Sequence, residues 1–240
     1  MDKIDYRRIL SEDFKSLSFS KDIIKPNKEG FITEALLKRF NFQESQTTLL
    51  NFGTGQGKTT AIYKLIKNYM DQGHTVIVAP PTISLISKYA DEIEKFGVDK
   101  SSIFDYRNLK KYAVRNNTYD ALQKPIQLIT VNSFLGNPGK LHPKQSQIKR
   151  NYLEDLAAHL KNKNKKIVLI FDEFHVASKS FRKRFLPNLN LFHNLIHSTI
   201  FSSATFSETS IIDIKNYSEF LKHNIQLYES PRLSTNKKTR

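Results

Sequence analysis

Short apolar runs rich in β-branched residues alternate along this chain with longer stretches of helical spacing, and this alternation restricts the possible folds. Strands are predicted at Thr48–Phe52, Thr75–Ala79, Ile126–Thr130, Ile167–Phe171 and Thr199–Ser202, with a further candidate at Ser102–Tyr106. Helices are predicted at Thr59–Gln72, Ile83–Phe96, Gln147–Asn162 and Asp213–Lys222. This order favours an α/β fold, a mostly parallel sheet with helices on both faces. Ligands of such sheets bind beyond the carboxyl ends of the strands, so we expect functional residues directly after the apolar runs.

A glycine-rich segment follows the first of these strands and leads into the first helix; it reads Gly53, Thr54, Gly55, Gln56, Gly57, Lys58, Thr59, Thr60. Glycines allow backbone N–H groups to turn around phosphate oxygens, and the start of a helix attracts the same anion. The segment therefore predicts a P-loop, in which Lys58 reaches the β- and γ-phosphates and the Thr59 hydroxyl binds Mg²⁺. Phe52 stands where the pattern has glycine. The alternative is a flexible loop that carries a lysine by chance.

Two acidic residues, Asp172 and Glu173, follow the apolar run Ile167–Phe171 directly. They are expected at the edge of the sheet that faces the phosphates. Asp172 is suited to hold Mg²⁺, directly or through water, and Glu173 to orient and deprotonate the attacking water. The alternative is an ordinary exposed acidic pair at a strand end. His175, considered alone, is more typical of a structural hydrogen-bonding residue.

Taken in order, these motifs resemble the N-terminal, RecA-like motor lobe of superfamily 2 helicases, the DEAD/DEAH-box-like group. Gly55 to Thr59 resembles helicase motif I, and Asp172 to His175 resembles the DExH form of motif II. Ser203, Ala204 and Thr205 are similar to motif III, which in the family couples the ATP site to nucleic acid and to a second lobe. The resemblance implies that Lys58, Asp172 and Glu173 are catalytic, with ATP and Mg²⁺ as cofactors. It also implies that His175 contacts the γ-phosphate side of the site.

The same resemblance implies contacts to the nucleic-acid backbone. Val78 to Leu85 resembles motif Ia, and the region of Thr130 lies where a further backbone-binding motif is expected. The implied contacts are Pro80, Thr82, Ser84 and Thr130, and the implied partner is DNA or RNA, mainly as single-stranded backbone. No glutamine motif precedes the P-loop. The printed sequence ends at Arg240, so a second motor lobe is expected from a longer chain or from a partner.

The charge of the chain agrees with a polyanionic partner. Lys and Arg number 38 against 23 Asp and Glu, a formal net charge of +15. Four basic clusters are candidates for phosphate contacts or for a solvated surface: Arg107 with Lys110, Lys111 and Arg115; Lys161–Lys166; Arg182–Arg184; and Lys237–Arg240. A Lys-rich source would give the same total without any such partner.

The remaining expectations concern organisation and location. The chain has no cysteine, which excludes disulfides, thiolate metal sites and a cysteine nucleophile. No apolar run is long enough to cross a membrane, and a cytoplasmic location is expected. We expect a helical lead-in at residues 1–44, the ATP-binding lobe at 45–229 and a basic linker or tail at 230–240. The stretch Asn137–Lys149 is expected to be a loop.

Three functions agree with these residues. The first is a motor lobe that hydrolyses ATP to move on or remodel DNA or RNA. The second is a nucleotide-gated nucleic-acid-binding or scaffold module with little hydrolysis of its own. The third, a P-loop kinase, leaves Ser203 to Thr205 without a role.

Overall fold

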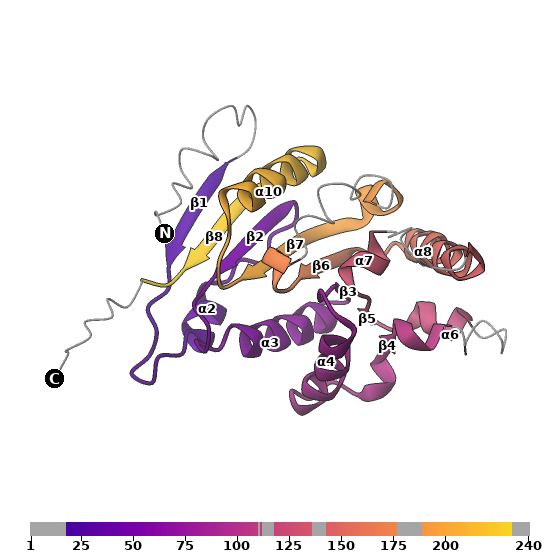
Figure 1. Ribbon diagram of the computed structural model, residues 1–240, viewed down its shortest axis with the longest axis horizontal. Helices are drawn as coiled ribbons and strands as arrows, with labels where there is room; N and C mark the ends of the chain where they lie inside the picture. Colours follow the sequence, from indigo (N-terminus) through magenta and orange to yellow (C-terminus); the bar gives the residue numbers. More distant parts are fainter. Residues whose placement is uncertain (1–17, 110, 112–117, 136–142, 177–188, 232–240) are drawn as a thin grey trace.

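The strands of this protein form one sheet in which all neighbours run parallel. The computed structural model describes residues 18–109, 111, 118–135, 143–176 and 189–231. Within these ranges the sheet has eight strands in the order β1-β8-β2-β7-β6-β3-β5-β4 (Figure 1). The strands are β1 (Phe19–Ile23), β2 (Gln46–Asn51), β3 (Thr75–Val78), β4 (Ile103–Asp105), β5 (Ile126–Leu128), β6 (Ile167–Phe171), β7 (Ile196–Ser203) and β8 (Asn224–Glu229). Because all are parallel, their carboxyl ends meet at one edge, called the carboxyl edge below.

Helices cover both faces of this sheet (Figure 1). They are α2 (Thr33–Arg39), α3 (Lys58–Asp71), α4 (Ile83–Lys95), α6 (Thr118–Gln123), α7 (Val131–Phe134), α8 (Pro143–Asn162) and α10 (Glu208–Leu221). Short 3₁₀ turns lie at Lys100–Ser102, Tyr106–Asn108 and His193–Leu195. Successive residues of β6 alternate between the faces: Val168 and Ile170 join the core with α2, α3 and α4, while Leu169 and Phe171 join the core with α8 and α10.

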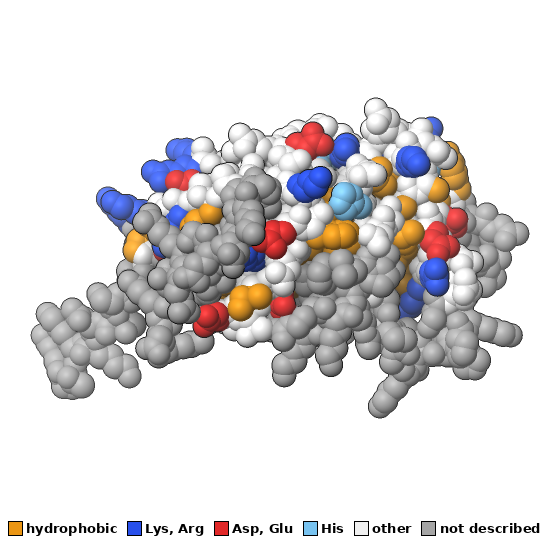
Figure 2. Space-filling model, turned by 90° about the horizontal axis from the view of Figure 1, so that it is seen from above, with side chains coloured by type: hydrophobic (Ala, Val, Ile, Leu, Met, Phe, Trp, Pro, Cys, Tyr) orange, Lys and Arg blue, Asp and Glu red, His pale blue; other side chains and the backbone are white. Residues whose placement is uncertain are grey.

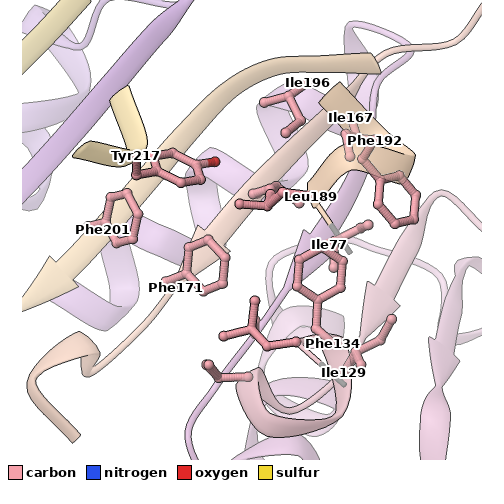
Figure 3. Close-up of a cluster of buried hydrophobic side chains, with 14 of the residues drawn as sticks. Ile77, Ile129, Phe134, Ile167, Phe171, Leu189, Phe192, Ile196, Phe201 and Tyr217 are labelled. Atoms are coloured by element: carbon pink, nitrogen blue, oxygen red, sulfur yellow. The ribbon is translucent and has the colours of Figure 1, made fainter. Parts of the chain in front are cut away.

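The core under α8 and α10 is rich in aromatic rings (Figure 3). Phe171 at the end of β6 stacks on Phe201 of β7, with 5.1 Å between ring centroids. Tyr217 of α10 packs edge-on against Phe201 and shares a 2.5 Å hydrogen bond with the Thr199 hydroxyl. Dense packing of this kind fixes the last residue of β6, and with it the direction in which the following acidic residues leave the sheet.

The predicted fold class is confirmed: the chain is an α/β protein with helices on both faces, and all six predicted strands are present. Two strands were not predicted. Residues 18–44 of the expected helical lead-in contain β1 as well as α2, and β1 pairs with β8. Both strands mix polar and apolar residues, so neither gives a continuous apolar run. Residues 1–17 lie outside the described residues.

One loop prediction was partly wrong. Helix α8 begins at Pro143, inside the stretch Asn137–Lys149 that was expected to be a loop. Proline marks a loop in many sequences, but it also fits the first position of a helix, where the N–H needs no intrahelical acceptor. Residues 136–142 lie outside the described residues.

Candidate functional site

The glycine-rich segment forms a tight turn between β2 and α3. Gly55 and Gly57 have φ angles of 79° and 81°, in the left-handed region that glycine adopts without a steric penalty. Gly57 is the residue before α3, and a Cβ built on it would lie 2.6 Å from the Thr33 hydroxyl oxygen. Only glycine fits there without displacing a neighbour. The turn therefore leads the backbone closely past α2 and into the positive end of α3, a geometry suited to an anion.

Residues at the start of helix α2 form hydrogen bonds with this turn, a contact that the sequence did not predict. The Ile32 N–H donates to the Gln56 carbonyl at 2.9 Å, and the Thr33 hydroxyl donates to the Gly57 carbonyl at 3.0 Å. The Gln56 side-chain oxygen accepts from the Gly53 N–H at 2.6 Å and from the Ser230 hydroxyl at 2.8 Å. Both the start of α2 and the residue after β8 thus fix the shape of the turn.

Phe52, the departure from the P-loop pattern, is fully buried. Its side chain belongs to the core with α2, α3 and α4 and does not enter the turn. The larger residue is therefore accommodated at the strand end. Thr54 and Gly55 at the tip of the turn are exposed, and Thr59 and Thr60 in the first turn of α3 are half-buried.

Asp172 lies at the carboxyl edge with its side chain almost fully buried, 3% exposed. One carboxylate oxygen, Oδ2, accepts a 2.7 Å hydrogen bond from the Tyr89 hydroxyl of α4. The other, Oδ1, is buried and has no hydrogen-bond partner among the described residues. An unsatisfied buried carboxylate oxygen is strongly unfavourable, so this atom fits a site for a cation or for a water molecule bound to one.

Tyr89 is a residue of this site that the sequence did not reveal. It lies on the buried face of α4 with Ile86 and Ile93, a spacing that predicts only a core position. Burial first, and then the charge of Asp172, raise its pKa well above the usual value, so the hydroxyl keeps its proton and acts as a donor. Tyr63 of α3 packs edge-on against it, with 5.2 Å between ring centroids.

Lys58 and Glu173 meet across the carboxyl edge. The Lys58 ammonium lies 3.8 Å from Glu173 Oε1, although β2 and β6 are separated in the sheet by β7. Lys58 is buried, 6% exposed, whereas Glu173 is one-third exposed. Glu173 has a φ of 47°, which is unusual for a residue with a side chain and typical of functional sites. The structure therefore brings Lys58 and Glu173 together, and it places Asp172, the residue before Glu173, at the same edge of the sheet.

A polar chain extends from Glu173 to the end of β7. His175 Nδ1 lies 3.3 Å from Glu173 Oε2 and 3.1 Å from the Ser203 hydroxyl oxygen. The Ser203 hydroxyl donates to the Thr205 carbonyl at 2.9 Å, and its oxygen accepts from the Thr205 N–H at 3.1 Å. Since the single Ser203 hydroxyl proton is used on Thr205, the tautomer with the proton on Nδ1 fits both contacts of His175. Half-buried Ala204 lies between the two motif III residues that make these contacts.

The four residues implied in backbone contacts follow the carboxyl ends of the neighbouring strands β3 and β5. Thr82 and Ser84 are exposed, with their hydroxyl oxygens 3.0 Å apart. Thr130 is buried and its hydroxyl accepts from the Ser133 N–H at the start of α7. The carbonyl of buried Pro80 accepts from the Val131 N–H at 3.0 Å, which links the two loops.

The basic clusters named from the sequence differ in their position relative to the carboxyl edge, and several lie outside the described residues. Lys161–Lys166 connects the end of α8 to the start of β6, so it lies at the opposite edge from Asp172. Arg107 forms an ion pair with Asp105. Lys110, Arg115, Arg182–Arg184 and Lys237–Arg240 lie outside the described residues. On the face seen in Figure 2, acidic and basic side chains are interspersed rather than gathered in one field.

Two further observations concern metal-binding clusters and membrane-spanning helices. Within the described ranges, no three His, Cys, Asp or Glu side chains form a cluster that could hold a metal ion. Mg²⁺ is commonly held by one or two protein ligands together with substrate phosphates, which agrees with Thr59 and Asp172 as the candidates. Among the helices that the structure describes, none is both long and apolar enough to cross a membrane.

Comparisons with known proteins concern the family and the fold. The family described as "Type III restriction enzyme, res subunit" matches residues 22–208. Comparison with curated protein sequences finds no match. Among solved structures, the UvsW helicase from bacteriophage T4 shares 15% identity with a TM-score of 0.50, covering 95% of this chain and 68% of that chain. A hypothetical ATP-dependent RNA helicase from Sulfolobus tokodaii shares 15% identity with a TM-score of 0.47, covering 84% and 57%.

The likeness to UvsW concerns the fold, because the sequence identity is low. A second structure of T4 UvsW has 14% identity and a TM-score of 0.48, and this chain covers 39% of it. The first UvsW structure and the family match confirm the expected resemblance to helicases for the fold, and the family match extends over most of the chain. The chain belongs to the helicase-like family of type III restriction enzyme res subunits.

Proposed function

We propose that this chain is the ATP-binding motor lobe of a nucleic-acid-dependent ATPase, which hydrolyses ATP to move on or remodel DNA or RNA. The observation that supports this most directly is the 3.8 Å approach of Lys58 to Glu173, beside the unpartnered oxygen of Asp172. A P-loop lysine, a buried carboxylate and a partly exposed carboxylate at one sheet edge are the groups that nucleotide hydrolysis requires.

Bound ATP would supply the phosphoryl group, and the accompanying Mg²⁺ would supply much of the positive charge that stabilises its transfer. In the proposal, the backbone from Thr54 to Thr60 surrounds the phosphates and the Lys58 ammonium binds their terminal oxygens. The Thr59 hydroxyl and Asp172 Oδ1 hold the metal ion or its water ligands. Tyr89 keeps Asp172 in the orientation that directs Oδ1 to the site.

Glu173 is the proposed general base. It is one-third exposed, so water reaches its carboxylate, and its left-handed backbone holds the carboxylate next to Lys58. A water molecule hydrogen-bonded to this carboxylate would be oriented to attack the terminal phosphorus of ATP. Its proton would pass to the carboxylate, and the bond from that phosphorus to ADP would break so that ADP leaves. The contact of Glu173 with His175, and of His175 with Ser203, connects the base to motif III.

This polar chain is the proposed route of coupling. A change in the position of Glu173 alters the contacts of His175 and Ser203, and through them the loop at Ala204 and Thr205. In the proposal, a single strand contacts Pro80, Thr82, Ser84 and Thr130 through its backbone, and a second motor lobe completes the ATP site. Phosphate contacts of this type depend on salt and not on sequence.

The test is ATP turnover in the presence of the second lobe, with and without single-stranded DNA or RNA. Wild type is compared with Glu173→Gln and with the matched control Glu208→Gln, an exposed residue of α10. We expect stimulation by nucleic acid in wild type and the control, and a loss of about 10²-fold or more in Glu173→Gln. Equal turnover in all three proteins would reject the proposal. Nucleic-acid affinity that responds to ATP without any turnover would support the binding module instead.

A further inference from the structure

A separate cavity of about 270 Å³ lies at the carboxyl edge, beside β4 and β5 and away from the phosphate turn. Its walls come from α4, from the turn after β4 and from α7 and α8. Four aliphatic side chains form the apolar part, namely Ile83, Ile86, Leu109 and Ile148. Ile86 and Leu109 are buried, whereas Ile83 is 61% exposed, the most exposed large apolar side chain among the described residues.

The polar part of the wall contains one hydroxyl without a partner. Tyr106 is 6% exposed, and its hydroxyl oxygen has no hydrogen bond within the part of the chain that the structure describes. Burial raises its pKa, so the group stays a neutral hydroxyl that can both donate and accept. A buried polar atom without a partner is unfavourable, and Tyr106 is one of the residues that line the cavity.

Two cationic side chains, Lys149 and Arg107, also line the cavity. The Lys149 ammonium is 5.3 Å from the centre of the Tyr106 ring and 3.4 Å from the Ser133 hydroxyl oxygen. The Arg107 guanidinium donates to the Ser87 hydroxyl at 2.7 Å and pairs with Asp105, and Asp105 does not line the cavity. The cavity therefore combines an apolar interior with positively charged and hydroxyl-bearing walls.

We infer that this cavity binds one nucleobase that has left the stack of a single strand. Aliphatic side chains suit the two faces of a base, the Tyr106 hydroxyl suits its polar edge, and Lys149 and Arg107 suit the adjoining phosphates. The volume lies just below the roughly 300–1,000 Å³ of pockets for drug-sized ligands, so it fits a single base or nucleoside. The inference rests on the proposed nucleic-acid partner and adds to it a contact that a purely backbone-binding path lacks.

The inference separates base binding from backbone binding, so abasic strands test it. Binding of the protein to a labelled single strand is measured by fluorescence anisotropy, with a DNA and an RNA strand of one sequence and with abasic strands of equal length and charge. We expect the abasic strands to bind about 5- to 150-fold more weakly, because stacking of a base contributes about 1–3 kcal/mol. The comparison of DNA with RNA identifies which strand supplies the base.

Two variants assign the effect to the cavity. Tyr106→Phe removes a hydroxyl that has no partner in the protein, so a purely structural role predicts no loss of stability. We expect it to weaken binding of the base-containing strand about two- to tenfold, as for the loss of one hydrogen bond, and to leave abasic binding unchanged. Ile83→Ala is expected to act in the same direction. Its matched control is Ile212→Ala, which changes an exposed isoleucine on α10.

The outcomes distinguish this inference from the proposed function. If no strand binds to the wild type, the proposed nucleic-acid partner is wrong, and the inference with it. If both kinds of strand bind equally well, only the base cavity is rejected. The inference is also overturned if Tyr106→Phe and Ile83→Ala weaken binding to abasic strands as much as to complete strands.

Discussion

The close approach of Gly57 to Thr33 gives a stability prediction that can be worked out from the structure. Gly57 has a φ of 81°, and a left-handed conformation costs a residue with a side chain about 1–2 kcal/mol. In Gly57→Ala the new Cβ would lie 2.6 Å from the Thr33 hydroxyl oxygen, so that hydroxyl must move. Its hydrogen bond to the Gly57 carbonyl is then lost, at a further cost of about 0.5–1.5 kcal/mol. The expected total is about 1.5–3.5 kcal/mol.

The matched control is Gly73→Ala. Gly73 has a φ of 88°, but no atom lies within 4 Å of a Cβ built on it, so only the backbone penalty of about 1–2 kcal/mol is expected. Because the chain has no tryptophan, urea unfolding is best followed by circular dichroism. Binding of a fluorescent ATP analogue is measured in parallel. We expect Gly57→Ala to weaken binding of the analogue roughly tenfold or more, which corresponds to about 1.4 kcal/mol or more of binding free energy. We expect Gly73→Ala to leave this binding unchanged.

A double-mutant cycle tests the cause. In a Thr33→Ala background the hydroxyl is absent, so Gly57→Ala should destabilise the protein no more than Gly73→Ala does. If Gly57→Ala costs the same free energy with and without the Thr33 hydroxyl, the close approach is not the reason that glycine is needed there, and the steric explanation is refuted.

Three further predictions concern buried side chains. Tyr89→Phe leaves Asp172 Oδ2 without its donor and should lower the free energy of unfolding by about 1–3 kcal/mol. The control Tyr63→Phe should change it little, because the Tyr63 hydroxyl has no partner among the described residues. Equal effects of the two variants in urea unfolding would contradict this prediction. His223 has its pKa lowered to about 4, mainly by burial, so its stabilising contribution is complete above pH 6.5 and is lost as the pH falls toward 4. The loss between pH 7.5 and 5 should be about 2 kcal/mol, and a His223→Gln variant that retains the full pH dependence would show that another group is responsible. Phe52→Ala empties a fully buried position and should cost about 3–5 kcal/mol in urea unfolding, and a cost below 1 kcal/mol would mean that the core does not depend on this ring.

Much of the fold could be predicted from the sequence because the central strands are buried on both faces. The run at Ile167–Phe171 is continuous and apolar, so its limits were predicted correctly. Strands β1 and β8 lie at one side of the sheet and contain Lys21, Asp22 and Gln226, so no comparable run marks them. Their pairing depends on residues about two hundred positions apart, which no local pattern specifies.

The same limit applies to the site. Lys58, Asp172 and Glu173 are recognisable because each lies in a motif next to a strand end, and the order of the motifs predicts that they meet. The supporting contacts of Tyr89 with Asp172, and of Thr33 with Gly57, join residues far apart in the sequence. Tyr89 resembles any core residue of an amphipathic helix, and its role is visible only when its hydroxyl is located in space.

The position of β8 between β1 and β2 affects folding during synthesis and the behaviour of truncated fragments. During synthesis β1 emerges early, yet the strand that holds it is near the other end of the printed sequence, so β1 stays without a neighbour until Asn224–Glu229 has been added. Such distant pairing is slow to form. A fragment that stops before Asn224 would expose the open backbone of β2 and would be prone to aggregate, whatever the condition of its phosphate turn.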